Sequence, residues 1–581
     1  MREKLLKRLF PYIIIAVVAS LVFANTLSFP VMDSWDDDVF VRDIAEYLNF
    51  RPANVIHLMT VSSFGNYVPL VNLSYAVDHS ICGLDGFMYH FQNILWHIAA
   101  CVGLFGCIRL LGVSDTFALL VTLLYAVHPQ RAESVAWVAE RRDVMCGAFY
   151  FWSFFCYMRF RERGFFSLGA FVLFICACLS KPAAVTMPVV FAMYEIWKSR
   201  SFLPLSKYRW IIPYVVVSAI VAVGTSVLQL NPQQSGTVFE KILRVFHNYA
   251  WYFVKNLYPG EMAPIYPNLV FDNWLLMKVS LFYIALSSVV FYLAFRARNF
   301  LLYSLVPFAV AYAVTLFPTI GFVPIGTGEW DYADRYSYIP SAILAATGGM
   351  LLYSAAGKFS NWRKFRQMEI VALLIMILFC AWITFFYNYT WKSYLDIISI
   401  TVAHDPPNRA FLCRYAVTEF AARRNDEAEK AADYLLSVEK KDHFDHNGKS
   451  IYYTAMAIKA AALDRRGDIN NSRALFDESL AYITHFIFQN PTILETAAHC
   501  YLKTGNKKKA IRCYDLLIVN FDSKKSNLGL FHFYKGISFY IRGNLKMAEV
   551  EFSQALRLIP EDDYIKVNLD EVRNKLKKNK Q

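Results

Sequence analysis

The chain has 581 residues, of which 56% are hydrophobic and 17% aromatic, and its formal net charge is +13. This composition excludes an ordinary soluble protein and is typical of an integral membrane protein. Many of the basic residues lie beside apolar runs, where they set membrane topology, so the charge does not indicate a nucleic-acid partner. The 11 cysteines form no zinc-like CxxC pair and are interpreted as small core residues.

About eleven apolar runs are candidate membrane spans, at roughly 20 residues per crossing. The first follows a basic N-terminus and continues to Phe29, which favours an uncleaved first helix over a signal peptide. The runs are 9–29, 89–111, 116–127, 144–160, 165–179, 185–197, 210–230, 274–295, 300–317, 338–353 and 370–386.

The positions of Lys and Arg orient these spans, because basic loops are retained on the cytoplasmic side. With the N-terminus in the cytoplasm, the basic clusters fall in the expected inner loops, at 159–163, 198–209, 296–298 and 358–366. The outer, non-cytoplasmic side then carries 33–39, 128–143, 180–184, 231–272 and 318–336. Because the number of spans is odd, everything after Phe386 also lies outside.

The first outer loop contains three consecutive carboxylates, Asp36, Asp37 and Asp38. Such charges cannot lie in hydrocarbon, so they face water or a polar cavity at the membrane edge. One carboxylate can act as general base on an acceptor hydroxyl, two can hold a divalent cation such as Mg²⁺ or Mn²⁺ against a phosphate, or the run is a solvated loop. Crowding raises the pKa of at least one carboxyl, which helps a base near neutral pH.

The second outer loop places two arginines, Arg141 and Arg142, beside acidic residues. The planar guanidinium suits a pair of phosphate oxygens, so either arginine can hold an anionic head group. The alternative is a structural ion pair with Glu133, Glu140 or Asp143. His128 precedes a proline and fits a helix end better than a ligand.

Two further outer loops each place one cation at the same edge, Lys181 and Arg335. Four polar loops of mixed charge below a helical bundle indicate a lipid substrate that bears a phosphate. The competing interpretation is a transporter, which needs ionisable residues inside its spans near the midplane. The spans carry few such residues, mainly Glu195, and this weighs against transport.

Two outer segments are amphipathic rather than spanning. In 239–258 the apolar residues recur at steps of three and four, the pattern of a helix that lies in the membrane interface. The segment 52–85 is similar but more broken. Such helices can form a rim around a cavity that opens sideways to lipid.

From Pro406 the apolar content falls while helical periodicity continues. Small residues and aromatics recur at the spacing of the 34-residue tetratricopeptide repeat, in which small residues let two helices cross closely. The copies are 533–560, 498–514, 460–476 and a degenerate copy at 410–438, followed by a polar capping helix at 564–580. Three to four repeats form a self-supporting α-solenoid with a concave surface, which can hold an extended protein acceptor.

The polar motifs together resemble a known family. They are Trp35-Asp36-Asp37, Asn66-Tyr-Val-Pro-Leu70, Tyr89-His90 with Asn93 and His97, His128-Pro129 with Glu133 and 141–143, Ser180-Lys181, and Ala333-Asp-Arg-Tyr-Ser-Tyr-Ile-Pro340. Their order and spacing resemble the transmembrane and tetratricopeptide-repeat O-mannosyltransferases and their bacterial relatives, within the glycosyltransferase-C superfamily.

The resemblance implies an all-α protein with a multi-spanning glycosyltransferase-C membrane domain at 1–400 and a tetratricopeptide-repeat domain at 401–581. It implies Asp36 and Asp37 as the catalytic pair, with Asp38 as an extra acid. It assigns donor phosphate binding to the basic positions and a supporting role to neighbouring polar residues. The basic positions that match the family are Arg141, Lys181 and Arg335, and Arg142 is the further phosphate candidate from the guanidinium argument. The supporting residues are Asp38, His128, Glu133 and Asp334.

Two positions depart from the family pattern. Val68 stands where relatives often have Arg, and Pro182 follows Lys181 where an acidic residue is common. Both positions bear on the donor sugar and on how its phosphate is bound.

The activity implied is inverting transfer of a sugar from a polyprenyl-phosphate carrier to a hydroxyl acceptor, such as protein Ser or Thr, on the outer membrane face. No Walker-type phosphate loop occurs or is needed. The alternative is a non-catalytic membrane anchor for a repeat scaffold. The cysteine usage and the lack of a retention signal favour a bacterial inner membrane over the endoplasmic reticulum.

Overall fold

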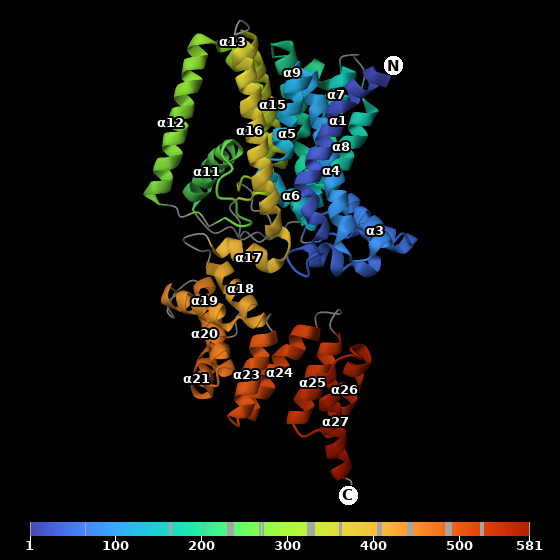
Figure 1. The fold of residues 1–581 in the computed structure, drawn as a ribbon, viewed down its shortest axis with the longest axis vertical. Coiled ribbons are helices and arrows are strands. Elements are labelled where there is room, and N and C mark those ends of the chain that lie inside the picture. Colours follow the sequence, from blue (N-terminus) through green and yellow to red (C-terminus); the bar gives the residue numbers. More distant parts are fainter. Residues whose placement is uncertain are drawn as a thin grey trace. The chain divides into compact units, whose positions relative to one another are not determined.

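A computed structural model describes residues 2–63, 65–161, 166–202, 204–228, 237–266, 269, 272–321, 332–358, 363–403, 409–438, 446–482, 491–522 and 528–579. Within these ranges the regular structure is helical, with one isolated bridge between Ser63 and Asn66. The predicted all-α class is confirmed. The chain divides into two compact units, Met1–Ile400 and Thr401–Gln581 (Figure 1).

Among the described residues, six helical segments are long and apolar enough to cross a membrane. They are Arg8–Ser28, Gly86–Leu110, Tyr208–Leu228, Asn273–Arg296, Arg298–Thr319 and Gln367–Trp391. The protein is therefore a membrane protein. The other predicted spans are also helices, namely α5 (Asp115–Ala126), α7 (Arg141–Arg161), α8 (Leu168–Ser180), α9 (Met187–Ser199) and α15 (Tyr338–Lys358).

The core of the first unit forms around the long helix α4 (Gly86–Leu110), which packs along α7. Small residues allow this close approach, because a Cβ added at Gly106 would lie 2.8 Å from the ring of Phe155. The cysteines of α4, Cys101 and Cys107, are buried in the same core, as predicted. By contrast α12 (Asn273–Arg296) lies at the edge of the first unit (Figure 1). Most of its apolar side chains are exposed, as those of a lipid-facing helix are.

Four segments between these helices form the loop end of the first unit. The first follows α1 (Arg2–Phe23) and η1 (Ala24–Ser28) and includes the short turn η2 (Asp38–Arg42). The second consists of η4 (Pro129–Arg131), α6 (Ala132–Ala136) and η5 (Val138–Glu140). The third is η6 (Pro182–Thr186), and the fourth is η10 (Asp334–Ser337).

The two predicted amphipathic segments are helical in the described residues. The segment 52–85 contains α2 (Pro52–Thr60) and α3 (Pro69–Cys82). The other is α11 (Val238–Leu257), which begins with a capping box between Thr237 and Glu240. Several predicted loop residues, among them Arg163 and Asp331, lie outside the described residues.

The second unit is a series of helices that each pack on their neighbours in sequence. The helices are α18 (Arg409–Ala421), α19 (Asn425–Val438), α20 (His446–Arg465), α21 (Ile469–Ser479), α23 (Pro491–Lys503), α24 (Lys507–Asp522), α25 (Leu528–Ile541), α26 (Leu545–Leu558) and α27 (Asp563–Lys578). The turns within three successive pairs contain Gly467, Gly505 and Gly543, with φ of 89°, 78° and 83°. Glycine adopts this left-handed conformation without strain. The predicted boundary residue Pro406 and the terminal Lys580 lie outside the described residues.

Candidate active site

The first loop holds its adjacent carboxylates in different environments. Asp37 is 1% exposed, and its carboxylate accepts hydrogen bonds from the amides of Met32 at 3.2 Å and Ala139 at 2.9 Å. Asp36 is partly open, with 39% of its side chain exposed. Asp37 therefore fixes the loop against η5, and Asp36 presents a carboxylate at the site.

The backbone of this loop is strained where Asp36 is presented. Trp35 and Asp36 have φ of 66° and 68°, a left-handed conformation that costs a non-glycine residue about 1–2 kcal/mol. The indole of Trp137 donates a hydrogen bond to the carbonyl of Trp35 at 3.1 Å. This bond and the anchoring of Asp37 maintain the strained turn.

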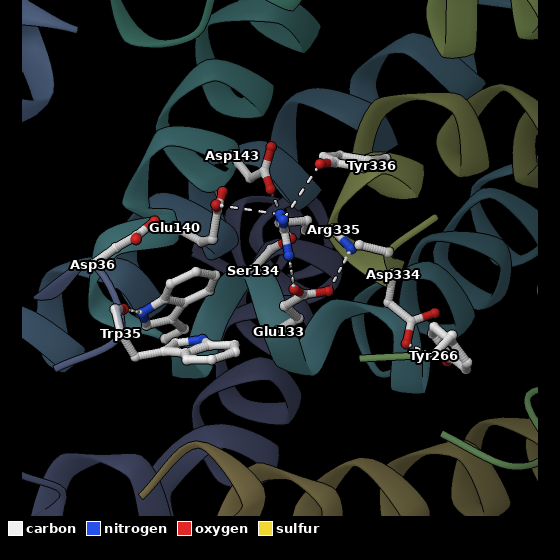
Figure 2. Close-up of polar contacts among 12 residues, drawn as sticks. Trp35, Asp36, Glu133, Ser134, Glu140, Asp143, Tyr266, Asp334, Arg335 and Tyr336 are labelled. Atoms are coloured by element: carbon white, nitrogen blue, oxygen red, sulfur yellow. Dashed lines mark hydrogen bonds and ion pairs between the residues drawn. The ribbon is translucent and has the colours of Figure 1, made fainter. Parts of the chain in front are cut away.

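Glu140 joins the cations of the charged cluster, and Figure 2 shows its side chain directed toward Arg335. Its carboxylate pairs with Arg142 at 2.6 Å and with Lys181 at 3.5 Å. Arg335 Nε lies 3.5 Å from the same carboxylate. Three of the four predicted phosphate-binding residues thus come together from the first turn of α7, the residue after α8 and the turn η10. From the sequence, Glu140 is predicted only as an ion-pair partner for an arginine.

The cluster reaches Asp36 on one side. Arg142 Nη2 lies 3.8 Å from the Asp36 carboxylate. Lys181 Nζ also pairs with Asp143 at 2.5 Å, and Ser134 donates to Asp143 at 3.1 Å. The partly exposed carboxylate of Asp36 is therefore the acid at the open edge of a cationic group.

Arg335 closes the other side of the cluster. Its main-chain amide donates to Glu133 Oε2 at 2.8 Å and its guanidinium binds Glu133 Oε1 (Figure 2). Arg335 also donates to the hydroxyl of Tyr336 at 3.3 Å. Glu133 thus holds Arg335 through both its backbone and its side chain.

Burial and charge set the protonation of these carboxyls. Burial raises the pKa of Asp36, against the lowering effect of Arg142. It raises the pKa of Asp37 to about 8 and that of Glu133 to about 7. Burial acts on Glu140 as well, but the three surrounding cations outweigh it and hold the pKa of Glu140 well below its usual range. Glu140 is therefore ionised and orders the cations.

Arg141 does not join the other predicted phosphate-binding residues. Its side chain is fully buried and pairs with Asp78 at 2.5 Å, with both side chains 0% exposed. It also donates to Asn93, to Ser74 and to the carbonyl of Tyr89. Because these contacts occupy its guanidinium inside the protein, Arg141 forms a structural ion pair. Its partner is Asp78, and not Glu133, Glu140 or Asp143 as the sequence alternative had it.

The remaining predicted supporting residues contact backbone or buried polar groups. Asp38 accepts from the amide of Val39 at 2.9 Å at the start of η2. His128 Nδ1 accepts from the amide of Gln130 at 3.3 Å and caps η4, as its position before a proline indicated. Asp334 is buried and accepts from Gln130 at 3.2 Å and from the Tyr266 hydroxyl at 2.7 Å.

The carboxylates of the site are engaged by cationic side chains. Among the described residues, no group of three His, Cys, Asp or Glu side chains is arranged to hold a metal ion. The carboxylates near Asp36 pair with Arg and Lys instead. A divalent cation held by two carboxylates and a phosphate, such as Mg²⁺ or Mn²⁺, stays a prediction from the sequence.

The fold and the site define a class of protein: a multi-spanning helical membrane protein with a charged site at one end of its bundle and a helical-repeat unit. The site combines one accessible carboxylate with three ordered cations. Such a group can accept a proton and stabilise a developing anion.

Comparisons with known proteins agree with this class, although no family model matches the chain. The chain is 32% identical over 194 residues to a protein named protein O-mannosyl-transferase tmtc2 from Xenopus laevis, a match that covers 30% of this chain and 23% of the relative. It is 31% identical over 181 residues to human TMTC2, covering 29% and 21%. It is 28% identical over 149 residues to mouse TMTC1, covering 23% and 16%.

The matched regions span less than a quarter of the length of these relatives. They confirm the resemblance to the transmembrane and tetratricopeptide-repeat O-mannosyltransferases over about a quarter to a third of this chain.

Proposed function

We propose that the protein is a glycosyltransferase that moves a sugar, mannose in the first instance, from a polyprenyl-phosphate carrier to a hydroxyl of a protein. The observation that carries this proposal is the meeting of Arg142, Lys181 and Arg335 at Glu140, directly beside the accessible Asp36. The names of the similar proteins support the sugar and the protein acceptor.

In the proposed step, the hydroxyl oxygen of the acceptor Ser or Thr attacks the anomeric carbon of the sugar. The new oxygen–carbon bond forms as the bond between the anomeric carbon and the carrier phosphate breaks. The electron pair of that bond goes to the phosphate oxygen, and the acceptor proton goes to Asp36. Attack opposite the leaving group inverts the anomeric centre. Arg142, Lys181 and Arg335 stabilise the charge that develops on the departing phosphate.

The carrier phosphate enters a cluster whose cations already face carboxylates. The three cations are surrounded by Asp36, Glu133, Glu140 and Asp143. A further anion is accommodated when one carboxyl takes up a proton. Glu133 fits this role, because burial raises its pKa to about 7 and it is paired with Arg335. Protonation of Glu133 frees the Arg335 guanidinium for the phosphate.

The membrane arrangement follows from the same assignment. The positive-inside pattern supports a site on the non-cytoplasmic face, where the carrier reaches it laterally from the outer leaflet. The helical-repeat unit then lies on this side and supplies a surface for an extended protein acceptor. The proposed location is a bacterial inner membrane, and the alternative is the membrane of the endoplasmic reticulum.

The test is a transfer assay with the purified full chain in lipid nanodiscs, radiolabelled polyprenyl-phosphate mannose and a Ser/Thr-rich peptide. We expect labelled peptide, and a loss of 100-fold or more with Asp36→Asn, since general bases contribute about 10²–10⁴-fold. We also expect transfer to continue in a metal chelator. Unchanged transfer by Asp36→Asn would remove Asp36 as the base. A folded wild type with no transfer would favour the non-catalytic scaffold.

A further inference from the structure

The helix α11 has its polar face turned inward and its apolar face turned outward. Its buried side chains include Arg244, Asn248 and Lys255. Its exposed side chains are apolar, namely Val238, Phe239, Ile242, Phe246, Phe253, Val254 and Leu257. This is the reverse of a helix on a soluble protein, and it fits a helix that faces lipid on one side and a polar site on the other.

The inward face of α11 is tied to the loop that carries Arg335. The hydroxyl of Tyr252 donates to the carbonyl of Ala333 at 2.9 Å, and the amide of Ala333 donates to the same hydroxyl at 3.1 Å. Ala333 immediately precedes η10, so these bonds fix the position of Asp334 and Arg335 relative to the helix. The two residues point in opposite directions from one turn, Arg335 to Glu133 and Asp334 to Tyr266 (Figure 2).

Three aromatic rings gather between α11 and this turn. The ring centroid of Trp251 lies 4.6 Å from that of Tyr332 and 4.8 Å from that of Tyr266. Tyr266 and Tyr332 stack at 5.3 Å with an interplanar angle of 27°. Trp251 and Tyr332 are each half-buried residues. We call Trp251, Tyr266 and Tyr332 the aromatic platform.

Buried polar groups hold the platform in place. The Tyr266 hydroxyl donates to Asp334 at 2.7 Å. Lys255 Nζ lies 5.0 Å from the ring centroid of Tyr266 and 5.5 Å from that of Trp251, and it donates to the carbonyl of Glu261 at 2.9 Å. A buried carboxylate and a buried lysine thus fix rings from separate segments. Fixed rings with a few directed polar groups are typical of a small-ligand site.

Tyr336 connects the platform to the cationic cluster. Its ring packs on the same apolar cluster as Trp251 and Tyr332. The Tyr336 ring also lies near two cations. Arg335 Cζ is 4.8 Å and Lys181 Nζ is 5.9 Å from its ring centroid. A ligand whose anionic group is held by Arg335 and Lys181 therefore has aromatic surface next to it.

We infer that the aromatic platform is the subsite for the sugar of the lipid-linked donor, a neutral hexose whose C–H face stacks on Trp251 and Tyr332. This inference rests on the proposed function, in which Arg335 and Lys181 hold the phosphate that joins sugar to carrier. Aromatic faces carry negative electrostatic potential and attract the polarised C–H groups of a pyranose ring. Asp334 and Lys255 are positioning residues that act through Tyr266.

The test separates recognition of the sugar from recognition of the carrier. Affinities are measured for polyprenyl-phosphate mannose and for unglycosylated polyprenyl phosphate, in an Asp36→Asn background that prevents turnover. In that background, Trp251→Ala is expected to weaken binding of the glycosylated carrier tenfold or more and that of the bare carrier by less than twofold. Phe239→Ala, which removes an exposed ring from the opposite face of α11, is the matched control and changes neither affinity.

Tyr332 supplies a second comparison that separates stacking from folding. Tyr332→Phe keeps the ring and is expected to retain the preference for the glycosylated carrier within twofold, whereas Tyr332→Leu loses it. Equal weakening of both carriers by Trp251→Ala and Tyr332→Leu would overturn the subsite, and so would no change in either. If the protein with an unchanged aromatic platform binds neither carrier, the proposed function fails and the sugar subsite fails with it.

Discussion

Asp37 Oδ1 accepts a hydrogen bond from the main-chain amide of Ala139 at 2.9 Å, although the two residues are 102 positions apart. Ala139 immediately precedes Glu140, the carboxylate that orders the three cations. The bond therefore sets the distance between the first loop and the cationic cluster. It also gives the two adjacent aspartates separate tasks, because the same loop leaves Asp36 partly exposed.

This division of tasks predicts different results for the two aspartates. Asp36→Asn should lower the transfer rate at least about 100-fold and leave the thermal unfolding midpoint close to that of wild type. The Asp37 carboxylate accepts from two backbone amides, and in Asp37→Asn the side-chain NH₂ group faces one of these donors and cannot accept from it. This variant should therefore destabilise the fold by about 1–3 kcal/mol. Transfer rates and unfolding midpoints in the same detergent check both. Equal loss of stability in the two variants would contradict the assignment.

The protonation of Glu133 predicts how donor binding depends on pH. Burial raises the pKa of Glu133 to about 7, and Glu133 pairs with Arg335. In the proposed mechanism the donor phosphate competes with ionised Glu133 for Arg335. The donor KM should therefore rise as pH increases through 7, by at most about tenfold per pH unit, and level off at lower pH. Glu133→Gln should remove this dependence between pH 6 and 8. A KM that falls with increasing pH in the wild type would be inconsistent with the proposed proton uptake.

The same raised pKa has a consequence for stability. The folded state retains a proton on Glu133 at pH values where the unfolded chain has lost it. The stabilising contribution is therefore complete below the ordinary Glu pKa and is lost as pH rises through about 7. Glu133→Gln should unfold with a midpoint that changes less over this range than that of wild type.

The neighbouring arginines predict a second contrast. Arg141→Met leaves the fully buried Asp78 without its cation, which should cost about 3–5 kcal/mol of stability. Arg142→Met removes one of three cations around Glu140 and should raise the donor KM about tenfold while the protein stays folded. Thermal unfolding and steady-state kinetics measure the two effects. Adding Asp78→Asn to Arg141→Met should recover part of the stability, and no recovery would argue against the pair.

Much of the fold could be predicted from the sequence, because apolar run length and helical period are local properties. In the described residues, each of the eleven apolar runs is largely helical. The amphipathic period at 239–258 predicted α11, and the small and aromatic residues after 401 predicted paired helices. Propensity and burial favour the same structure in these segments, so tertiary context did not override them.

The candidate site could be predicted only in part. The sequence indicated the acidic run and the basic loops, but Arg141 and Arg142 are consecutive on a helix and point about 100° apart. Which of them faces the site depends on the packing of α7 against α3 and α4. The meeting of three cations at Glu140 also depends on tertiary packing, so the sequence did not reveal it. The aromatic platform was not predicted. Its available sequence signal is the polar set Arg244, Asn248 and Lys255, whose spacing places these residues on one face of α11.

The helix pairs of the second unit predict a test of their packing. Gly536 on α25 faces Phe552 on α26, and a Cβ at this position would lie 2.6 Å from Phe552 Cδ1. Gly536→Val should therefore force the two helices apart and destabilise the unit by about 1–3 kcal/mol. Gly543→Asn is the control, since Gly543 has φ of 83° with nothing within 4 Å of an added Cβ, and Asn tolerates this conformation.

Limited proteolysis of the full chain should cleave after residue 401 faster in Gly536→Val than in the control. Equal cleavage rates would show that the close crossing at Gly536 contributes little to this unit.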